Sequence, residues 1–441
     1  MKSKGLLTAS FLLLVLVAVI WWSNKKAATA DKPPTENTTT KLVSLPEEQF
    51  QEVEIKKRTG EAVRLQRVDS KWRIVAPAPL PADPDAVSSM LSALSSLSSD
   101  RTVEEEPAGL DQYGLTQPAL ELSLTDKNKK TAKLLIGDDT PAGSAVYAAI
   151  AGDSRVFALS SYKKNSFDKS SDDLRDKRLL TFASDKVSSI ELTAKKQTLA
   201  FARSKDEWQV VKPKPFRADR SQVEDLLRTL HDAKMDLSGG YDEKKTATAF
   251  GSGTPFASAK VADASGTLEL QIRKNKDDYY AKSSAVAGVY KISSSTGTGL
   301  DKGLDDFRNK KLFDFGFADP DKIEMHDGPK SYLITHNGSD WWSNGTKMDS
   351  GAVSTLLDKL RDLSATKFPE AGFTTPALDV TVTSDGGKRT EKVFLSKNGD
   401  NYVAKRENEP ALYELNASAV TELQKSAADL KPAATPLPKK K

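Results

Sequence analysis

The 441-residue sequence contains three histidines, whose imidazole side chains are candidates for acid/base or metal chemistry. His231 follows Leu230 in an amphipathic pattern, which predicts a solvated or boundary position on a helix. His326 and His336 flank a predicted hairpin and, with Asp327 beside the first, could approach across it as a weak metal or acid/base pair. A metal site needs three or four ligands, and nothing in the sequence completes such a set. We therefore expect no metal site.

Other catalytic signatures are missing from the sequence. It has no cysteine, which excludes cysteine nucleophiles, disulfides, thiolate zinc sites and a lipid-modified cysteine anchor. It has no G-x-S-x-G, Walker-type or H-E-x-x-H motif, and "GTGLDKG" lacks the dinucleotide-binding glycine spacing. Two carboxylates far apart in sequence would suffice for a glycosidase, so a hydrolase stays open as the least favoured reading. We expect a protein that is not an enzyme and holds no cofactor.

A tryptophan pair, Trp341 and Trp342, is the candidate binding surface. It is flanked by Asn-Gly-Ser and Asn-Gly-Thr, and exposed aromatic rings among small polar residues can stack on sugars. Successive strand residues point to opposite faces, so one ring is expected in the core and the other at a partly exposed position. The Asn-Gly steps are typical of hairpin turns.

Repetition organises the chain that must position these residues. The segments "ADPDAVSSMLSAL", "ADRSQVEDLLRTL" and "MDSGAVSTLLDKL" each place an aspartate (Asp83, Asp219, Asp349) four residues before a valine, and apolar residues follow with helical spacing. The aspartates lie 136 and 130 residues apart. Such regular spacing predicts three copies of one module.

Strand-like runs ending in tryptophan precede each predicted helix, and alternating strands follow it. Two copies close with the connectors "LRDKRLLTF" and "FRNKKLFDF", while the third ends in "VTELQKSAADL". The sequence predicts an α+β fold of three tandem modules, residues 46–182, 183–316 and 317–430. Each module is expected to be a mostly antiparallel sheet with one principal packed helix after its third strand, and its tryptophan, tyrosines and helix leucines are expected in the core.

The N-terminus carries the signal for localisation. Residues 5–22 are uncharged and lie between lysine pairs, which predicts a transmembrane anchor over residues 1–26 that contacts the lipid bilayer through residues 5–22. A cleaved signal peptide is the alternative, since residues 28–30 fit A-x-A. A flexible tether is expected over residues 27–45 and a disordered basic, proline-rich tail over 431–441. Flanking charge leaves the orientation open, and one long polar chain after a short anchor favours export.

Net charge argues against nucleic acid as a partner. The sequence holds 65 basic and 61 acidic residues, and four of the basic residues precede residue 27. The remainder is balanced, whereas nucleic-acid binding depends on concentrated positive charge.

The anchor, the tandem units, the turn-plus-strand "GLTQPALELSL" and the segment "LRDKRLL" resemble the bacterial family catalogued as domain of unknown function 4340. This resemblance implies an envelope protein of unassigned activity, often encoded beside an ABC-type exporter, and brings no catalytic residues. We expect a non-enzymatic scaffold or accessory subunit at the bacterial cytoplasmic membrane, with a single pass and its body on the periplasmic side. A module that binds cell-wall glycan through Trp341 or Trp342 is the alternative.

Overall fold

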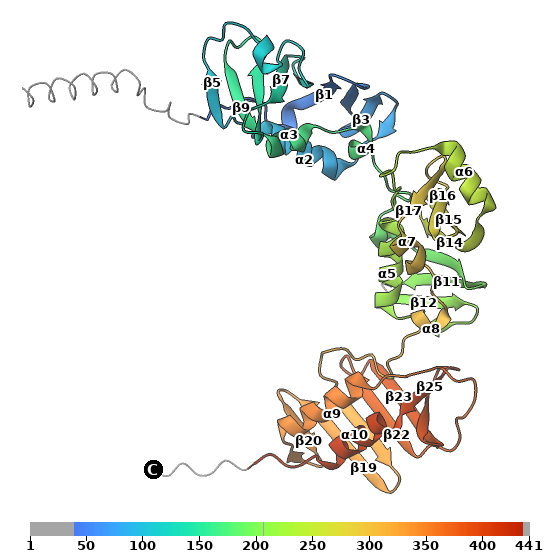
Figure 1. The fold of residues 1–441 in the computed structure, drawn as a ribbon. Helices are drawn as coiled ribbons and strands as arrows, with labels where there is room; N and C mark the ends of the chain where they lie inside the picture. The colour runs from blue at the N-terminus through green and yellow to red at the C-terminus, as the bar shows by residue number, and fades with distance from the viewer. Residues whose placement is uncertain (1–38, 206, 435–441) are drawn as a thin grey trace, which may run out of the picture. The chain divides into compact units, whose positions relative to one another are not determined.

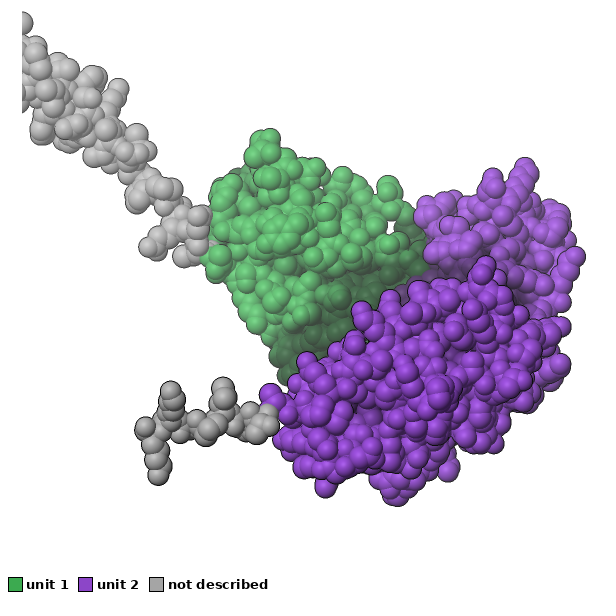
Figure 2. Space-filling model, turned by 90° about the horizontal axis from the view of Figure 1, so that it is seen from below, with its two compact units in different colours: residues 1–177 green, residues 178–441 purple. Residues whose placement is uncertain are grey.

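The computed structural model describes residues 39–205 and 207–434. The predicted anchor at residues 5–22 lies outside them, as do most of the predicted tether and tail. Over the described ranges, no helix is both long and apolar enough to cross a membrane. The chain divides into two compact units, residues 1–177 and residues 178–441, which Figure 2 colours separately.

The first unit contains a nine-stranded sheet, and every pairing described in it is antiparallel. Its order is β4-β3-β2-β1-β6-β7-β8-β9-β5. The strands are β1 (Phe50–Lys57), β2 (Val63–Val68), β3 (Lys71–Ala76), β4 (Leu80–Pro81), β5 (Arg101–Glu104), β6 (Leu120–Asp126), β7 (Thr131–Asp139), β8 (Ala145–Ile150) and β9 (Val156–Ser160). Two meanders therefore meet where β1 pairs with β6.

The second unit contains two eight-stranded antiparallel sheets with the same plan. The second sheet, β13-β12-β11-β10-β14-β15-β16-β17, consists of β10 (Ser189–Ala194), β11 (Gln197–Ser204), β12 (Glu207–Lys212), β13 (Phe216–Arg217), β14 (Thr254–Asp263), β15 (Gly266–Asn275), β16 (Asp278–Ser283) and β17 (Val289–Ile292). The third sheet, β21-β20-β19-β18-β22-β23-β24-β25, consists of β18 (Lys322–Asp327), β19 (Lys330–Asn337), β20 (Asp340–Ser343), β21 (Thr346–Lys347), β22 (Leu378–Ser384), β23 (Arg389–Asn398), β24 (Asn401–Arg406) and β25 (Leu412–Asn416). The predicted tandem α+β architecture is confirmed as three antiparallel sheets with helices.

One principal helix follows the fourth strand of each sheet: α2 (Pro84–Ser95), α5 (Arg220–His231) and α9 (Ser350–Asp362). The helices begin where the sequence predicts, because the side chains of Asp83, Asp219 and Asp349 accept hydrogen bonds from first-turn amides. Each buries the predicted apolar stripe, such as Val223, Leu226, Leu227 and Leu230 of α5. A two-residue strand (β4, β13 or β21) stands between the expected third strand and the helix, so each helix comes one strand later than expected.

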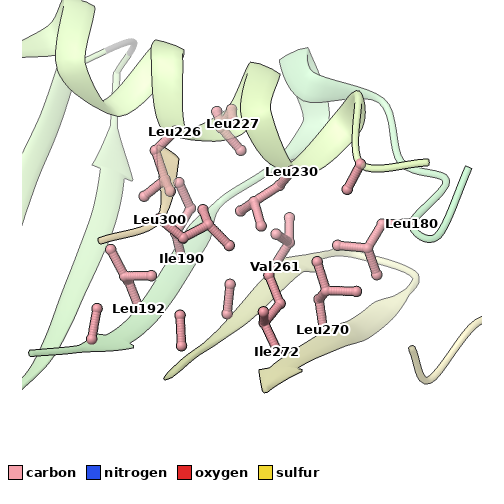
Figure 3. Packing of buried hydrophobic residues seen from close by; sticks show 14 of the residues in the cluster. Leu180, Ile190, Leu192, Leu226, Leu227, Leu230, Val261, Leu270, Ile272 and Leu300 are labelled. Carbon is pink, nitrogen blue, oxygen red and sulfur yellow. The ribbon is translucent and has the colours of Figure 1, made fainter. Parts of the chain in front are cut away.

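The connector between successive sheets serves both of them. Phe307 closes the core of the second sheet, and Leu312 and Phe313 lie in the core of the third. The sequence assigns "LRDKRLLTF" to the end of the first module, yet Leu179 and Leu180 pack in the core of the second sheet, where Figure 3 shows Leu180 among Leu230, Val261 and Leu270.

The three modules end differently. The first closes with α3 (Ser161–Phe167) and α4 (Ser171–Leu174), and the second closes with α7 (Ser294–Gly299) and α8 (Leu304–Phe307). The second also carries α6 (Glu243–Ser252) before β14. In the third, "VTELQKSAADL" forms most of one long helix, α10 (Ala417–Ala428), which lies beside α9 and buries Val420, Leu423 and Ala427 (Figure 1).

The predicted aromatic core is confirmed in part. Trp208, Trp341, Phe157, Tyr290 and Tyr413 are buried. Half-buried positions are taken by the remaining predicted core rings: Trp72, Tyr147, Tyr280 and Tyr402.

Candidate functional site

The tryptophan pair lies on β20 of the third sheet, with one ring on each face. Trp341 is 5% exposed and belongs to the core on the helix side. Trp342 is half-buried on the opposite face, which we call the open face. Strand alternation therefore separates the two rings, and only Trp342 is placed to meet a ligand.

Strand register shows that Trp341 is a repeated structural residue. Trp72 pairs with Arg67, Trp208 with Arg203 and Trp341 with His336. The guanidinium carbon of Arg203 lies 5.8 Å from the Trp208 ring centroid, and the His336 ring stacks on Trp341 with centroids 4.5 Å apart. The repeated tryptophan thus lies against an arginine side chain in the second sheet and against a histidine ring in the third.

The open face of the third sheet mixes polar and apolar groups. Trp342 lies opposite Thr335 of β19, and Leu333, also on β19, is 39% exposed. On β23, the Nζ of Lys392 lies 4.9 Å from the ring centroid of Phe394. In the register of the second sheet, Gln209 occupies the position of Trp342, opposite Ala202. The open aromatic ring is therefore particular to the third module.

The histidines do not form the acid/base or metal pair that the sequence left open. His326 is exposed on the open face, and its Nδ1 lies 3.0 Å from Oδ1 of Asp379 on β22. His336 pairs with Trp341 on the helix side, so the sheet separates the two rings. The pairing hypothesis is wrong because the register matches His326 with Ser331 across the hairpin. Among the described residues, no three His, Cys, Asp or Glu side chains group as metal ligands.

His231 occupies the boundary position that its helical pattern predicts. Its side chain is 38% exposed, and its Nδ1 lies 3.0 Å from Oδ1 of Asp232. The Phe182 ring meets the imidazole edge-on at 5.9 Å. This histidine thus packs against Phe182 at the edge of the second core and contacts the carboxylate that follows it in the chain.

An open groove of about 590 Å³ runs along the exposed side of α5 in the second module. Its apolar floor is Trp208 and Leu227, both 4% exposed. Its rim carries His231 and charged side chains of both signs: Asp185, Arg203, Glu224, Asp225 and Arg228. Arg228 forms an ion pair with Asp225, and Ser184 and Ser221 also line the groove.

An arginine sandwich joins the second and third sheets. The guanidinium carbon of Arg308 lies 4.3 Å from the ring centroid of Phe216 in β13 and 3.6 Å from that of Phe368, which follows α9. Arg308 is only 9% exposed, and this burial lowers its pKa although Asp305 partly compensates. A buried guanidinium between two rings gains cation–π attraction in a poorly hydrated setting.

Beside the sandwich lies a cluster that we call the charged joint: Arg217, Asp314, Glu391, Arg406 and Glu409. Arg217 of the second sheet pairs with Asp314, and its Nε lies 2.9 Å from Oε1 of Glu409. Burial acts to lower the pKa of Arg217, but Tyr413, Asp314 and Glu409 outweigh burial and raise it.

The third sheet completes the charged joint. Arg406 contacts Glu391 at 3.0 Å and Glu409 at 2.8 Å, and the Glu391 side chain is 3% exposed. The backbone N–H of Asp314 donates to Glu391 at 3.1 Å. A buried carboxylate with several donors is strongly held, so the joint fixes the connector between the sheets.

Sequence reasoning missed the charged joint. Its partners are far apart in the chain: Asp314 lies 97 positions after Arg217, and Tyr413, which Arg217 also contacts, lies 196 positions after it. The repeat of Arg175 and Arg308, 133 residues apart in the two connectors, was a signal for the neighbouring sandwich and not for the joint.

A family model described as "Domain of unknown function (DUF4340)" matches residues 72–209 and residues 208–372. The first match begins at Trp72 and the second at Trp208, so they start one repeat apart. A comparison with curated proteins gives no match.

Proposed function

The chain belongs to the family described as Domain of unknown function (DUF4340), and we propose that it is a membrane-anchored scaffold or accessory subunit that contacts an envelope protein. The proposal assigns it no enzymatic reaction. The proposal rests on the construction of the chain: repeated, polar-faced modules, of which the second and third are held together by side-chain contacts.

The observation that carries the proposal is the charged joint together with the Arg308 sandwich. Connector residues Arg308 and Lys311 form β-bridges to Ala218 in the second module and to Ser364 in the third. Only two residues separate these bridges, so the linker is too short to let the second and third modules move far apart. A subunit that spaces or braces a partner needs such a fixed link between modules.

The membrane placement rests on the sequence. Residues 5–22 would span the bilayer of the bacterial cytoplasmic membrane in a single pass, with the body in the periplasm. Lys41 pairs with Ser98, and Leu42 and Val43 are buried, so the body begins 19 residues after Trp22. This short spacing would keep the first module near the membrane and favours a membrane partner, for which an ABC-type exporter fits the family resemblance.

Native purification tests this proposal. The full-length protein is isolated from its host in mild detergent, and mass spectrometry records its intact mass and its co-purifying proteins. We expect an uncleaved chain with a stoichiometric membrane partner, and loss of that partner when residues 1–30 are replaced by a cleavable signal. A mature chain that begins near Asp31 and purifies alone would contradict the scaffold function.

A second candidate is a glycan-binding module, favoured by Trp342 on the open face of the third sheet. A half-buried indole beside Thr335 offers a stacking surface with polar neighbours. The test is retention of the protein on purified cell wall, with Trp342→Gln as the variant because Gln209 fills this position in the second module. Equal retention of the variant and the native protein would remove this candidate.

A further inference from the structure

Phe317 is the most exposed large apolar residue of the described chain, at 98% exposure. It ends the connector run "FDFGF", in which Phe313 and Phe315 are buried. Gly316 adopts a φ of +67°, so the chain turns at this glycine instead of continuing the alternation inward. A single exposed apolar side chain is ordinary on a protein surface, so a role for Phe317 in recognition depends on the comparison of the repeats and on the contacts that hold this loop.

The same position is polar in the other two modules. Lys41, Arg178 and Lys311 are equivalent because each forms the bridge that leads the chain into its module. Six residues further on, the three copies carry Glu47, Ser184 and Phe317. Core packing therefore does not require an aromatic residue here.

Arg361 of α9 holds this loop in place. Its Nε donates to the carbonyl oxygen of Gly316 at 3.0 Å, and its Nη2 donates to the carbonyl of Phe317 at 3.1 Å and to Asp319 at 3.0 Å. Its guanidinium carbon also lies 5.3 Å from the Phe315 ring centroid. Because the backbone that carries Phe317 is already fixed, binding loses little conformational entropy.

The charge beside Phe317 defines the partner. The Arg361 side chain is 17% exposed, whereas its two carboxylate partners, Asp319 and Asp358, are 44% and 62% exposed. The rim is therefore acidic, which disfavours an anionic lipid surface and suits basic side chains.

We propose that Phe317 is the anchor by which this chain docks into an apolar pocket of a protein partner, and that lysine or arginine side chains rim this pocket. This inference rests on the scaffold function proposed above, because it names the contact through which the scaffold binds. The loop of residues 316–319 is the docking surface, and Arg361 positions it.

Site-specific photo-crosslinking in the host identifies what meets Phe317. The full-length chain carries p-benzoylphenylalanine at position 317 or, as a control, at Tyr162, a 69% exposed ring of the first unit. After irradiation, the linked peptide is sequenced. The expected result is an adduct at position 317, and not at 162, with a second protein whose linked residue lies among apolar residues next to Lys or Arg.

Affinity then tests the contact with that identified protein, purified. Phe317→Ser should weaken binding at least tenfold, or about 1.4 kcal/mol, without changing thermal unfolding. Arg361→Lys keeps the charge but loses the fork that holds the loop, so it should weaken binding less. Val211→Ser, at a 42% exposed position of the second sheet, is the matched control and should bind normally.

Three other outcomes would each contradict the proposal that Phe317 is the docking anchor. An adduct with a second copy of the chain, or with lipid, would give Phe317 a different role. If the same partner co-purifies equally with the native chain and with Phe317→Ser, the scaffold function stands and the anchor fails. If no partner purifies with the native chain and no adduct forms, both proposals fail.

Discussion

The second and third modules share their interior and differ on their surface. Leu230 and Leu360 occupy equivalent helix positions and are both fully buried, and each helix begins at a capping aspartate. At the surface, however, Phe317 stands where the second module has Ser184, and Trp342 where it has Gln209. The repeated positions build the fold, and both proposed contacts with a partner or ligand fall on the unrepeated aromatic residues of the third module.

The largest expected effect tests the shared interior. Leu230→Ala and Leu360→Ala should each destabilise its own module by about 3 kcal/mol, because each removes a fully buried side chain and leaves a cavity. Hydrogen exchange, read separately for the strands of the two sheets, measures both losses in the full-length protein. A loss below about 1 kcal/mol for one leucine alone would show that the two interiors are not equivalent.

The charged joint between the second and third sheets gives the next effect. Glu391→Ala should destabilise the third sheet by about 3 kcal/mol, since it leaves Arg406 and the Asp314 amide without their buried acceptor. Urea unfolding of the full-length protein measures the loss.

The matched control for the charged joint is a surface ion pair of the same module. Lys359 and Glu422 lie 2.6 Å apart with 40% and 57% exposed side chains. Glu422→Ala should leave unfolding unchanged because water screens such a pair. Equal effects of the two substitutions would mean that the joint is no more than a surface feature.

Helix capping sharpens the comparison at a smaller scale. Asp219 accepts hydrogen bonds from the amides of Ser221 and Gln222 and from the Ser221 hydroxyl, whereas Asp349 accepts one from the amide of Ala352. Asp219→Ala should therefore cost about 1.5 kcal/mol and Asp349→Ala about 1 kcal/mol. Hydrogen exchange of the first-turn amides of α5 and α9 measures the two losses. A larger loss for Asp349→Ala than for Asp219→Ala would contradict this prediction.

The features that depend on local spacing could be predicted from the sequence. The apolar stripe and the capping aspartate fix each helix within a few residues, and strand alternation placed one ring of the Trp341–Trp342 pair in the core. The joint could not be predicted, because ion pairs between Arg217 and Glu409 depend on how two sheets meet.

Two local features also could not be predicted from the sequence. The F-x-F-x-F spacing of residues 313–317 suggests continued alternation, and only the left-handed conformation of Gly316 reverses it. Whether His326 and His336 share a face depends on hairpin register, which the sequence did not specify.

The smallest expected effect concerns equivalent tyrosines. Tyr290 of β17 and Tyr413 of β25 both lie opposite an alanine. Tyr290 stacks on Tyr241 with centroids 4.8 Å apart, while Tyr413 meets the edge of Phe368 and donates to Glu409 at 2.6 Å. In the second module, burial, with the neighbouring Tyr290, raises the pKa of Tyr241 to about 12.

A raised phenol pKa favours the neutral form in the folded state. The contribution of Tyr241 to stability is therefore fully present below its ordinary pKa of 10.0 and is lost as the pH rises from there through about 12. Tyr241→Phe should reduce the late phenolate step near pH 12 in the ultraviolet titration of the folded protein and lessen the loss of stability above pH 10, while Tyr113 and Tyr413, whose pKa values are also raised, still titrate late. Tyr162→Phe, which removes a 69% exposed phenol, should leave that step in place. If the late step keeps its full size in Tyr241→Phe, the stacked pair does not protect this phenol, and the two modules differ less at their closing strands than their contacts indicate.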